Sequence, residues 1–531
     1  MKKIICLLIT LVIGFIAYYL TLPAINLNNI GFYIYIAFIL FTYAMLEMMT
    51  TSVIKVDKKG IKKVGEFPKT ITYVLSGIVI MFLGVIIANF VCSPLFNAKS
   101  YQKRITIREN ASFTEEIPEV NFNQLPLLDK ASSQVLGDRV MGQISDLVSQ
   151  FDVSSIYTQI NYNDQIMRVT PLEYADGIKW FTNRKKGIAG YITVDSVTGE
   201  SKLVKLNKGM KYSPSAYFNE NLERKLRFEY PTTNFGKISF EIDNEGNPYY
   251  IVPTIKYTAI GLKAKVSGVI IFDPITGESK KYSNDEIPTW VDVAYSANLI
   301  IEQVDDWGTY KNGFWNSIFG QKNVVNTTEG YNYLAMNDDV YLYTGITSVV
   351  SDESNLGFIL TNMRTGETTF YDVPGAEEYS AMSSAEGQVQ DMGYTSTFPL
   401  LINLNGTPTY LVSLKDSSGL VKKYAFIDVK DYQKVVVTDS SDGIIKAKDN
   451  YLASIKKEVK DEELVIKEIK VQNINSASIN GYTYYYIQAD DKKYKLSITL
   501  SDNLPFIKNG DIIKIGYYET ENDIIKVEKM Y

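Results

Sequence analysis

The side chains that most often carry enzyme chemistry are scarce in this sequence. Its 531 residues include no histidine and only two cysteines, Cys6 and Cys92. This composition excludes histidine-dependent catalytic triads, histidine-ligated metals and four-cysteine zinc sites. Catalysis would have to use carboxylates, hydroxyls or lysines, and we expect no cofactor and no metal site.

Neighbouring acidic residues are the remaining candidates for catalysis. They occur as Asp285-Glu286, Asp305-Asp306, Asp338-Asp339 and Glu377-Glu378. Two carboxylates held roughly 5–9.5 Å apart can hydrolyse a glycosidic bond. Adjacent residues of a strand point to opposite faces, however, and a chain with 60 acidic residues contains such pairs by chance. We therefore predict no catalytic residue, and a carboxylate-dependent hydrolase is only the third hypothesis for this chain.

Residues 306–333 form an aromatic segment among glycines and asparagines. Long loops of this kind often form binding surfaces, and Trp and Tyr are favoured interface anchors. Packing of the rings onto a neighbouring core is the commoner arrangement. The segment is still the best candidate for a binding surface, through Trp307, Tyr310, Phe314, Trp315 and Phe319.

Three stretches align without gaps and predict the same β-hairpin. They are GYITVDSVTGESKLV from Gly190, GVIIFDPITGESKKY from Gly268 and GFILTNMRTGETTFY from Gly357. An Asp or Asn side chain accepts hydrogen bonds from the backbone of a turn, and a glycine three or four residues later supplies a positive φ. We interpret the shared residues as structural turns: Asp195 and Gly199, Asp273 and Gly277, Asn362 and Gly366. A weaker copy begins at Tyr424 and keeps Asp428.

A helix and further strands are predicted before each hairpin. The helices are expected at about 131–148, from Ser213-Pro214 onward, at 293–304 and at 376–391, because apolar residues recur there at helical spacing. The strands are joined by short turns, which makes them antiparallel. The repeated unit is thus a helix followed by an antiparallel sheet, which is an α+β architecture.

This repeated unit resembles the PepSY domain. The matching residues are Val194, Asp195, Gly199 and Glu200 in one copy, and Phe272, Asp273, Gly277 and Glu278 in the next. The resemblance covers about residues 130–437 as four degenerate copies. It implies an extracytoplasmic binding or inhibitory module, which in some families regulates peptidases, and it brings no catalytic residue.

The C-terminal part has a different pattern. Residues 462–531 contain five short apolar-rich strands, separated by turns such as Asn480-Gly481 and Asn509-Gly510. Five strands in so short a segment resemble a small OB-like barrel. A cluster of tyrosines at 482 and 484–486 could stack on a ligand, although tyrosine is common in strands.

Three apolar runs near the N-terminus predict transmembrane helices at about 4–22, 30–49 and 72–91. Each run is long enough to cross a hydrocarbon core of roughly 30 Å at 1.5 Å per residue. Lysines precede the first run and crowd the loop after the second, whereas the loop 23–29 carries no charge. The positive-inside rule then places the N-terminus in the cytoplasm and everything after about Ser93 outside.

Charge excludes one class of partner. Residues 1–95 hold eight lysines and three acidic residues, a balance of +5, and the whole chain carries −6, so the remainder carries −11. An acidic exterior part does not favour nucleic-acid binding. The abundance of Lys, Ile, Asn and Tyr suggests an AT-rich bacterial genome.

These patterns predict a multipass plasma-membrane protein of the bacterial cell envelope, with the bilayer and a protein, peptide or wall component as partners. We expect a non-catalytic binding or regulatory role, with a structural subunit of a larger membrane complex as the alternative. The expected parts are a transmembrane region at 1–95, a linker and first strand at 96–129, PepSY-like modules at 130–210, 211–285, 286–374 and 375–440, and an OB-like barrel at 451–531.

Overall fold

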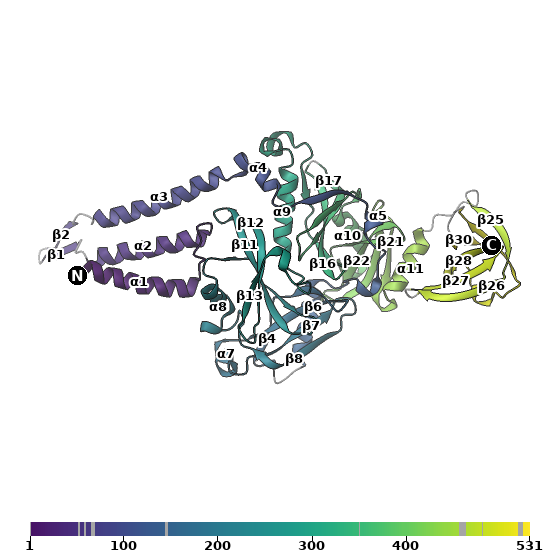
Figure 1. The fold of residues 1–531 in the computed structure, drawn as a ribbon, viewed down its shortest axis with the longest axis horizontal. Helices are drawn as coiled ribbons and strands as arrows, with labels where there is room; N and C mark the ends of the chain where they lie inside the picture. The colour runs from purple at the N-terminus through teal and green to yellow at the C-terminus, as the bar shows by residue number, and fades with distance from the viewer. Residues whose placement is uncertain are drawn as a thin grey trace. The chain divides into compact units, whose positions relative to one another are not determined.

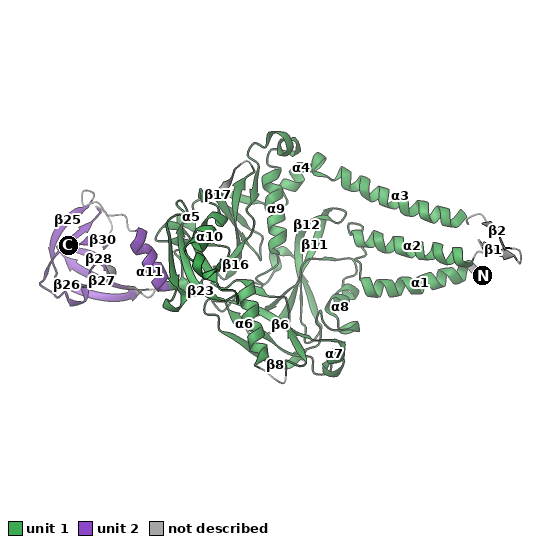
Figure 2. Ribbon diagram, turned by 180° about the vertical axis from the view of Figure 1, so that it is seen from behind, with its two compact units in different colours: residues 1–444 green, residues 445–531 purple. Residues whose placement is uncertain are grey.

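The computed structural model describes residues 2–50, 54–57, 60–64, 69–143, 147–349, 351–455, 464–479, 482–518 and 524–531. The chain divides into two compact units, Met1–Ile444 and Ile445–Tyr531 (Figure 2). Apolar helices at the N-terminus and several antiparallel sheets make the fold α+β, which confirms the predicted class at this level.

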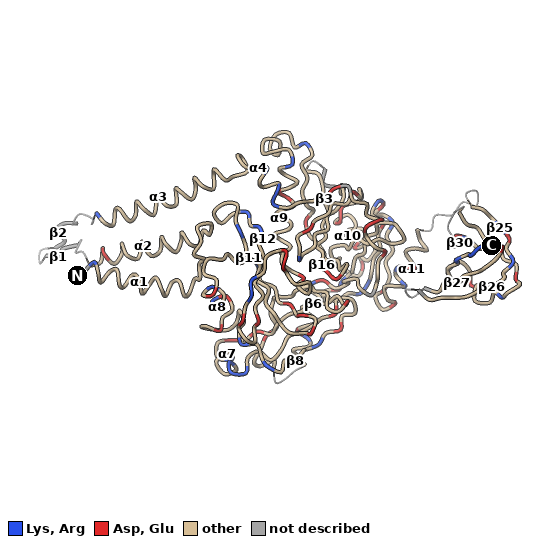
Figure 3. Tube along the Cα trace, viewed as in Figure 1, with Lys and Arg blue, Asp and Glu red and all other residues tan. Residues whose placement is uncertain are grey.

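The N-terminal helices are α1 (Lys2–Thr21), α2 (Ile30–Thr50) and α3 (Lys69–Val91) (Figure 1). All three are long and apolar enough to cross a membrane, and their bounds agree with the predicted runs to within three residues. Charged residues lie only near their ends (Figure 3). Strands β1 (Ile54–Asp57) and β2 (Gly60–Val64) form an antiparallel hairpin between α2 and α3.

Four antiparallel sheets follow, each preceded by a helix. The first unit contains α6 (Lys130–Gly142), β4 (Phe151–Val153), β5 (Thr158–Tyr162), β6 (Gln165–Tyr174), α7 (Gly177–Asn183), β7 (Ile188–Asp195) and β8 (Ser201–Met210). The second contains α8 (Leu222–Glu229), β9 (Asn234–Phe235), β10 (Ser239–Ile242), β11 (Pro248–Ala259), β12 (Leu262–Phe272) and β13 (Ser279–Tyr282). In the first sheet, β4 and β5 both pair with β6, and β7 and β8 follow in chain order. In the second sheet, β9 and β10 both pair with β11, and β12 and β13 follow in chain order.

The third and fourth units repeat this order. The third contains α9 (Ala297–Thr309), β14 (Val325–Thr327), β15 (Asn332–Met336), β16 (Asp339–Ser348), β17 (Ser351–Asn362), β18 (Thr368–Tyr371) and β19 (Gly375–Ala376). The fourth contains α10 (Glu378–Gly387), β20 (Thr395–Ser396), β21 (Leu400–Leu404), β22 (Thr407–Lys415), β23 (Val421–Asp428) and β24 (Val435–Asp439). Between α3 and the first unit lie α4 (Pro94–Gln102), β3 (Ile107–Ala111) and α5 (Phe113–Glu116). Strand β3 joins the third sheet, parallel to β18.

The second sheet is covered on both faces, and this explains its apolar strands. Successive side chains of a strand point to opposite faces. Along β11, Tyr250 and Val252 join a core with the first sheet, whereas Ile251 joins a core with α9 and the third sheet. The first three units therefore share two continuous cores.

The repeated turns have the same hydrogen bonds in three hairpins. Asp195 Oδ1 accepts from the amides of Val197 and Thr198, both at 2.8 Å, and the Gly199 amide donates to the Asp195 carbonyl at 2.9 Å. Asp273 and Asn362 accept the equivalent bonds. The glycine φ angles are +78°, +79° and +78° at positions 199, 277 and 366. These residues therefore reverse the chain.

One helix begins later than the sequence indicates. The prediction started the second helix at Ser213-Pro214, but α8 begins at Leu222. Asn221 is its N-cap, because its side chain accepts from the amide of Arg224 at 3.1 Å. Ser213 instead lies in an isolated bridge with Asn221, so the Ser-Pro pair enters a turn rather than the helix.

The second compact unit consists of α11 (Ile444–Ile455, which starts at its boundary) and one six-stranded sheet. The strands are β25 (Val465–Lys470), β26 (Asn473–Ile479), β27 (Tyr482–Ala489), β28 (Lys492–Ser497), β29 (Ile512–Tyr517) and β30 (Ile524–Met530). Their order is β25-β29-β30-β28-β27-β26, with β28 and β30 parallel. Its own core includes Ile487, Tyr494 and Ile515.

Candidate functional site

The structure divides the predicted aromatic surface into two parts. Trp307 is 7% exposed and lies in the core formed by α9, and Tyr310 ends α9 with its ring against Tyr101. Trp315 and Phe319 are 62% and 78% exposed, and their rings stack at 5.9 Å. Phe314 contacts Trp315 edge-on. Of the five predicted residues, Phe314, Trp315 and Phe319 form an aromatic surface, whereas Trp307 and Tyr310 pack against neighbouring elements.

The acidic pairs adjacent in sequence belong to separate local interactions. Asp305 accepts from the amide and hydroxyl of Thr327, at 2.8 and 2.9 Å. Its neighbour Asp306 instead forms ion pairs with Arg104 and Lys263. The other three pairs likewise have distinct local surroundings: Glu286 caps its own turn, Asp339 pairs with Arg364, and Glu378 is buried against Tyr343 and Asn355.

A different pair of carboxyl groups lies buried where the first three units meet. Glu241 on β10 is fully buried and accepts from the amides of Asp292 and Val293, at 2.7 and 3.1 Å, and from the Ser239 hydroxyl. Asp292 is 2% exposed and accepts from the Asn161 amide at 2.9 Å. The two residues are 51 positions apart, so the sequence carried no local signal for them.

Burial shifts both of these acids in the same direction. It raises the pKa of Glu241 to about 7, although three hydrogen bonds oppose the shift. The pKa of Asp292 also lies well above its usual value, first because of burial and then because of the charge on Glu241. Desolvation disfavours the charged form of a carboxyl group. Both side chains are closed off from solvent, so the pair cannot meet a substrate.

A groove of about 800 Å³ lies on the first compact unit. Its wall includes residues 104–108, which lead into β3, and the turn between β17 and β18. Uncharged polar and aromatic side chains dominate the rest: Thr106, Asn284, Tyr295, Gln303, Asn337, Tyr341, Thr365, Thr368, Thr369 and Tyr371. Its volume lies within the range of ligand sites.

The acids that border the groove are Glu116 and Glu367. Glu116 pairs with Arg108 through two contacts, one of 2.8 Å, and Tyr371 is near the same carboxylate. Arg108 lowers the pKa of Glu116 and keeps it ionised. Because this carboxylate stays ionised, it can accept hydrogen bonds from a cationic group but has no proton to donate as a general acid.

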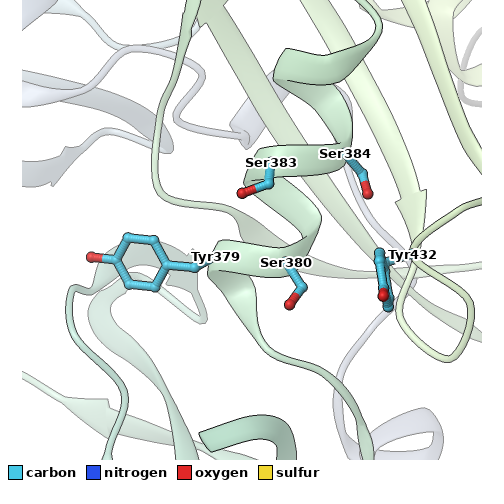
Figure 4. Close-up of a pocket in the computed structure, with 5 residues that line it drawn as sticks. All are labelled: Tyr379, Ser380, Ser383, Ser384 and Tyr432. Atoms are coloured by element: carbon cyan, nitrogen blue, oxygen red, sulfur yellow. The ribbon is translucent and has the colours of Figure 1, made fainter.

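A second hollow lies on α10, and it is shallow. Figure 4 shows Ser380, Ser384 and Tyr432 on one side of the helix, with Tyr379 pointing away on the other. Its volume is about 390 Å³. Serine hydroxyls beside an exposed ring offer little enclosure, so we place the candidate site in the larger groove.

Among the residues that the structure describes, no cluster of three or more Cys, Asp or Glu side chains is placed to hold a metal ion. No family model and no curated protein matches the chain.

Proposed function

We propose that the protein is a membrane-anchored, extracytoplasmic binding or regulatory protein of the bacterial cell envelope, and that it acts without catalysis. The observation that carries the proposal is the 800 Å³ groove, which belongs to the same compact unit as the three apolar helices. Its polar and aromatic lining suits recognition. Of the two acids that border the groove, Glu116 forms an ion pair with Arg108.

An extended peptide segment is the ligand that the groove suits best within the wider class of proteins, peptides and wall components. Strand β3 lines the groove and ends the strand order of the third sheet. The last strand of a sheet has unpaired N–H and C=O groups along its outer edge, and an extended peptide can bind there as one more strand of the sheet.

Topology supports the extracytoplasmic side. Lysines lie in the first turn of α1 and between α2 and α3, and the loop between α1 and α2 carries none. The folded part contacts that uncharged loop, because the Ile25 amide donates to the Pro231 carbonyl at 2.8 Å and the Gly261 amide donates to the Asn28 carbonyl at 2.8 Å. By the positive-inside rule this end of the helices faces outward.

The repeated units support a PepSY-like assignment, and the second compact unit supports an OB-like one. Each of the four units is a helix followed by an antiparallel sheet with the strand order that the hairpins require. In the second compact unit, only Val471 and Gln472 separate β25 from β26. The Val471 amide donates to the Asp511 carbonyl, directly before β29, and the Gln472 amide donates to the Gln488 carbonyl of β27. The segment that joins β25 to β26 therefore contacts strands from both sides of the sheet order, which supports the OB-like proposal.

Thiol labelling tests the topology. In a background without Cys6 and Cys92, Ser418→Cys should react with a membrane-impermeant maleimide on intact cells, and Lys3→Cys should react only after lysis. Both residues are exposed. The reverse pattern would place the folded part in the cytoplasm and contradict the proposal.

Photo-crosslinking in native membranes tests the binding role. A photoreactive residue at Lys265, which is exposed on the groove wall, should give specific protein or peptide adducts. The matched control is the exposed Lys493 in the second compact unit. Identical adducts at both positions, or none at Lys265, would contradict recognition by the groove. A single membrane protein captured in fixed proportion through the apolar helices would instead favour the structural-subunit alternative.

A further inference from the structure

Helix α8 lies beside the end of α1 (Figure 1), and two of its arginines bind backbone carbonyls there. Arg224 Nε donates to the carbonyl of Tyr19 at 3.1 Å, and Arg227 Nε donates to the carbonyl of Leu22 at 3.0 Å. The last carbonyls of a helix lack partners within it, and cations are favourable at that end. Helix α8 is thereby fixed where α1 leaves the membrane-spanning region.

A group of exposed apolar side chains lies beside α8. We call Ile178, Phe181, Tyr217 and Phe218 the α7 patch; their exposed fractions range from 47% to 73%. The buried Trp180 supports the patch from below, with its ring 5.4 Å from that of Tyr217 and 5.7 Å from that of Phe218. The Tyr217 and Phe218 rings thus pack against Trp180 on one side and are exposed to solvent on the other.

Phe218 is held outward by an unfavourable backbone conformation. Its φ is +51°, a region that bulky residues rarely adopt. The Phe218 carbonyl accepts from Arg224 at 2.7 Å, and the next residue, Asn219, accepts from the Tyr19 hydroxyl at 3.3 Å. The strained residue is thus connected to the last turn of α1 through Arg224 and Asn219.

A second exposed group lies near the end of α3. We call Trp315, Ile318 and Phe319 the η4 patch, after the short helix η4 (Asn316–Gly320); their exposed fractions are 62%, 49% and 78%. The Tyr101 hydroxyl donates to the carbonyl of Cys92, directly after α3, at 2.8 Å. The Tyr101 ring contacts Tyr310, which lies five residues before Trp315. Both patches therefore begin close to the end of an apolar helix.

We propose that the α7 patch and the η4 patch insert into the headgroup region of the bilayer that the helices cross. Aromatic side chains are favoured in this region because it lies between the apolar acyl chains and water. The rings of Trp, Tyr and Phe contact the acyl chains there, and the polar tips of Trp and Tyr contact the headgroups. Lys185 and Lys186 are exposed shortly after α7, and Lys322 is exposed after η4, where they can meet lipid phosphates. The proposal rests on membrane anchoring but not on which side the folded part faces.

Lipid-borne quenching of tryptophan tests this arrangement. All four tryptophans, at positions 180, 290, 307 and 315, lie outside α1, α2 and α3, so they report only the folded part. The full-length protein is placed in phosphatidylcholine vesicles whose acyl chains carry bromine near the headgroup, with and without phosphatidylglycerol. We expect quenching that is largely lost in Trp315→Phe and retained in Trp290→Phe, and stronger quenching with the anionic lipid.

A second set of variants tests the α7 patch. In the Trp315→Phe background, Phe181→Trp should restore quenching. The control is Tyr432→Trp, which also replaces an exposed aromatic residue by Trp but lies on the fourth repeated unit, and it should not restore quenching. Flotation of the vesicles with the protein reports anchoring independently. If the protein floats but neither Trp315 nor Phe181→Trp is quenched, the patches do not enter the bilayer and the proposal is overturned. If the protein does not float, membrane anchoring fails as well.

Discussion

Glu241 and Asp292 make the folded protein sensitive to pH. An unfolded glutamate titrates near 4.5, and the folded pKa is about 7, so between these values the folded state binds protons more readily. Stability contributed by the protonated acid is present at low pH and falls as pH rises through 7. Asp338 and Asp339 also favour the protonated form of Asp292.

We therefore expect Asp292→Asn to stabilise the protein at high pH. The amide keeps an oxygen for the Asn161 amide and removes the charge that repels Glu241. At pH 8 the gain should be on the order of 2 kcal/mol, and it should shrink towards pH 5. Urea unfolding of the full chain in detergent, followed by tryptophan fluorescence at several pH values, measures this. The exposed Asp372→Asn is the control, and an equal effect at both pH values would contradict the assignment.

Two arginines near β3 provide a second comparison at the scale of single residues. The Arg104 side chain is 2% exposed and pairs with the buried Asp306, whereas the Arg108 side chain is 58% exposed and pairs with Glu116. Removing Arg104 leaves the buried Asp306 with the ion pair to Lys263, and breaking a buried pair costs up to about 3–5 kcal/mol. We expect Arg104→Ala to lower the unfolding midpoint strongly and Arg108→Ala to leave it nearly unchanged. Similar midpoints for the two variants would show that burial does not control these pairs.

At the scale of elements, the repeated hairpins share a turn but differ in what surrounds it. A Cβ at position 199 would lie 3.5 Å from Leu128 and Leu136, which is ordinary contact. At position 277 it would meet the Tyr212 ring at 2.5–2.8 Å, and at position 366 it would meet the Tyr295 ring at 2.7–3.1 Å. The three turns therefore share a conformational requirement for glycine, and two of them add a steric one.

The alanine variants should separate these two requirements. Gly199→Ala should cost about 1 kcal/mol, because only the positive φ is penalised. Gly277→Ala should cost about 3 kcal/mol, because the tyrosine ring must also move. Unfolding midpoints of the two variants and of Gly366→Ala give the order directly. A cost for Gly199→Ala equal to that of the others would mean that the backbone conformation alone sets the requirement.

Elements that depend on nearby residues could be predicted from the sequence, and those that depend on the fold could not. The hairpins and apolar helices are coded within short windows, and their positions agree closely with the sequence patterns. The predicted start of α8 was wrong, because Asn221 caps the helix in place of the earlier Ser-Pro pair. Burial of Trp307 had a signal in its helical spacing from Ile300 and Val304, all in one core. The groove, and the meeting of Glu241 with Asp292, follow only from tertiary packing.

At the scale of the whole molecule, shared cores bind together the first three repeated units of the first compact unit. The second sheet contributes Tyr250 to one core and Ile251 to another, so its neighbours on both faces depend on it. The core of the second compact unit draws only on residues from Ile469 to Met530. Cooperative unfolding should therefore follow the division at Ile444 rather than the repeats.

Deleting 445–531 should leave the unfolding of the first compact unit unchanged. All four tryptophans lie before residue 445, so tryptophan fluorescence reports that unit alone. The transition of the full chain and that of the truncated chain in detergent should coincide. The fragment 445–531, followed by the near-ultraviolet circular dichroism of its tyrosines, should unfold in one cooperative transition because it carries its own core of Ile487, Tyr494 and Ile515. A shifted tryptophan transition after truncation, or a fragment without a cooperative transition, would mean that the two units fold as one.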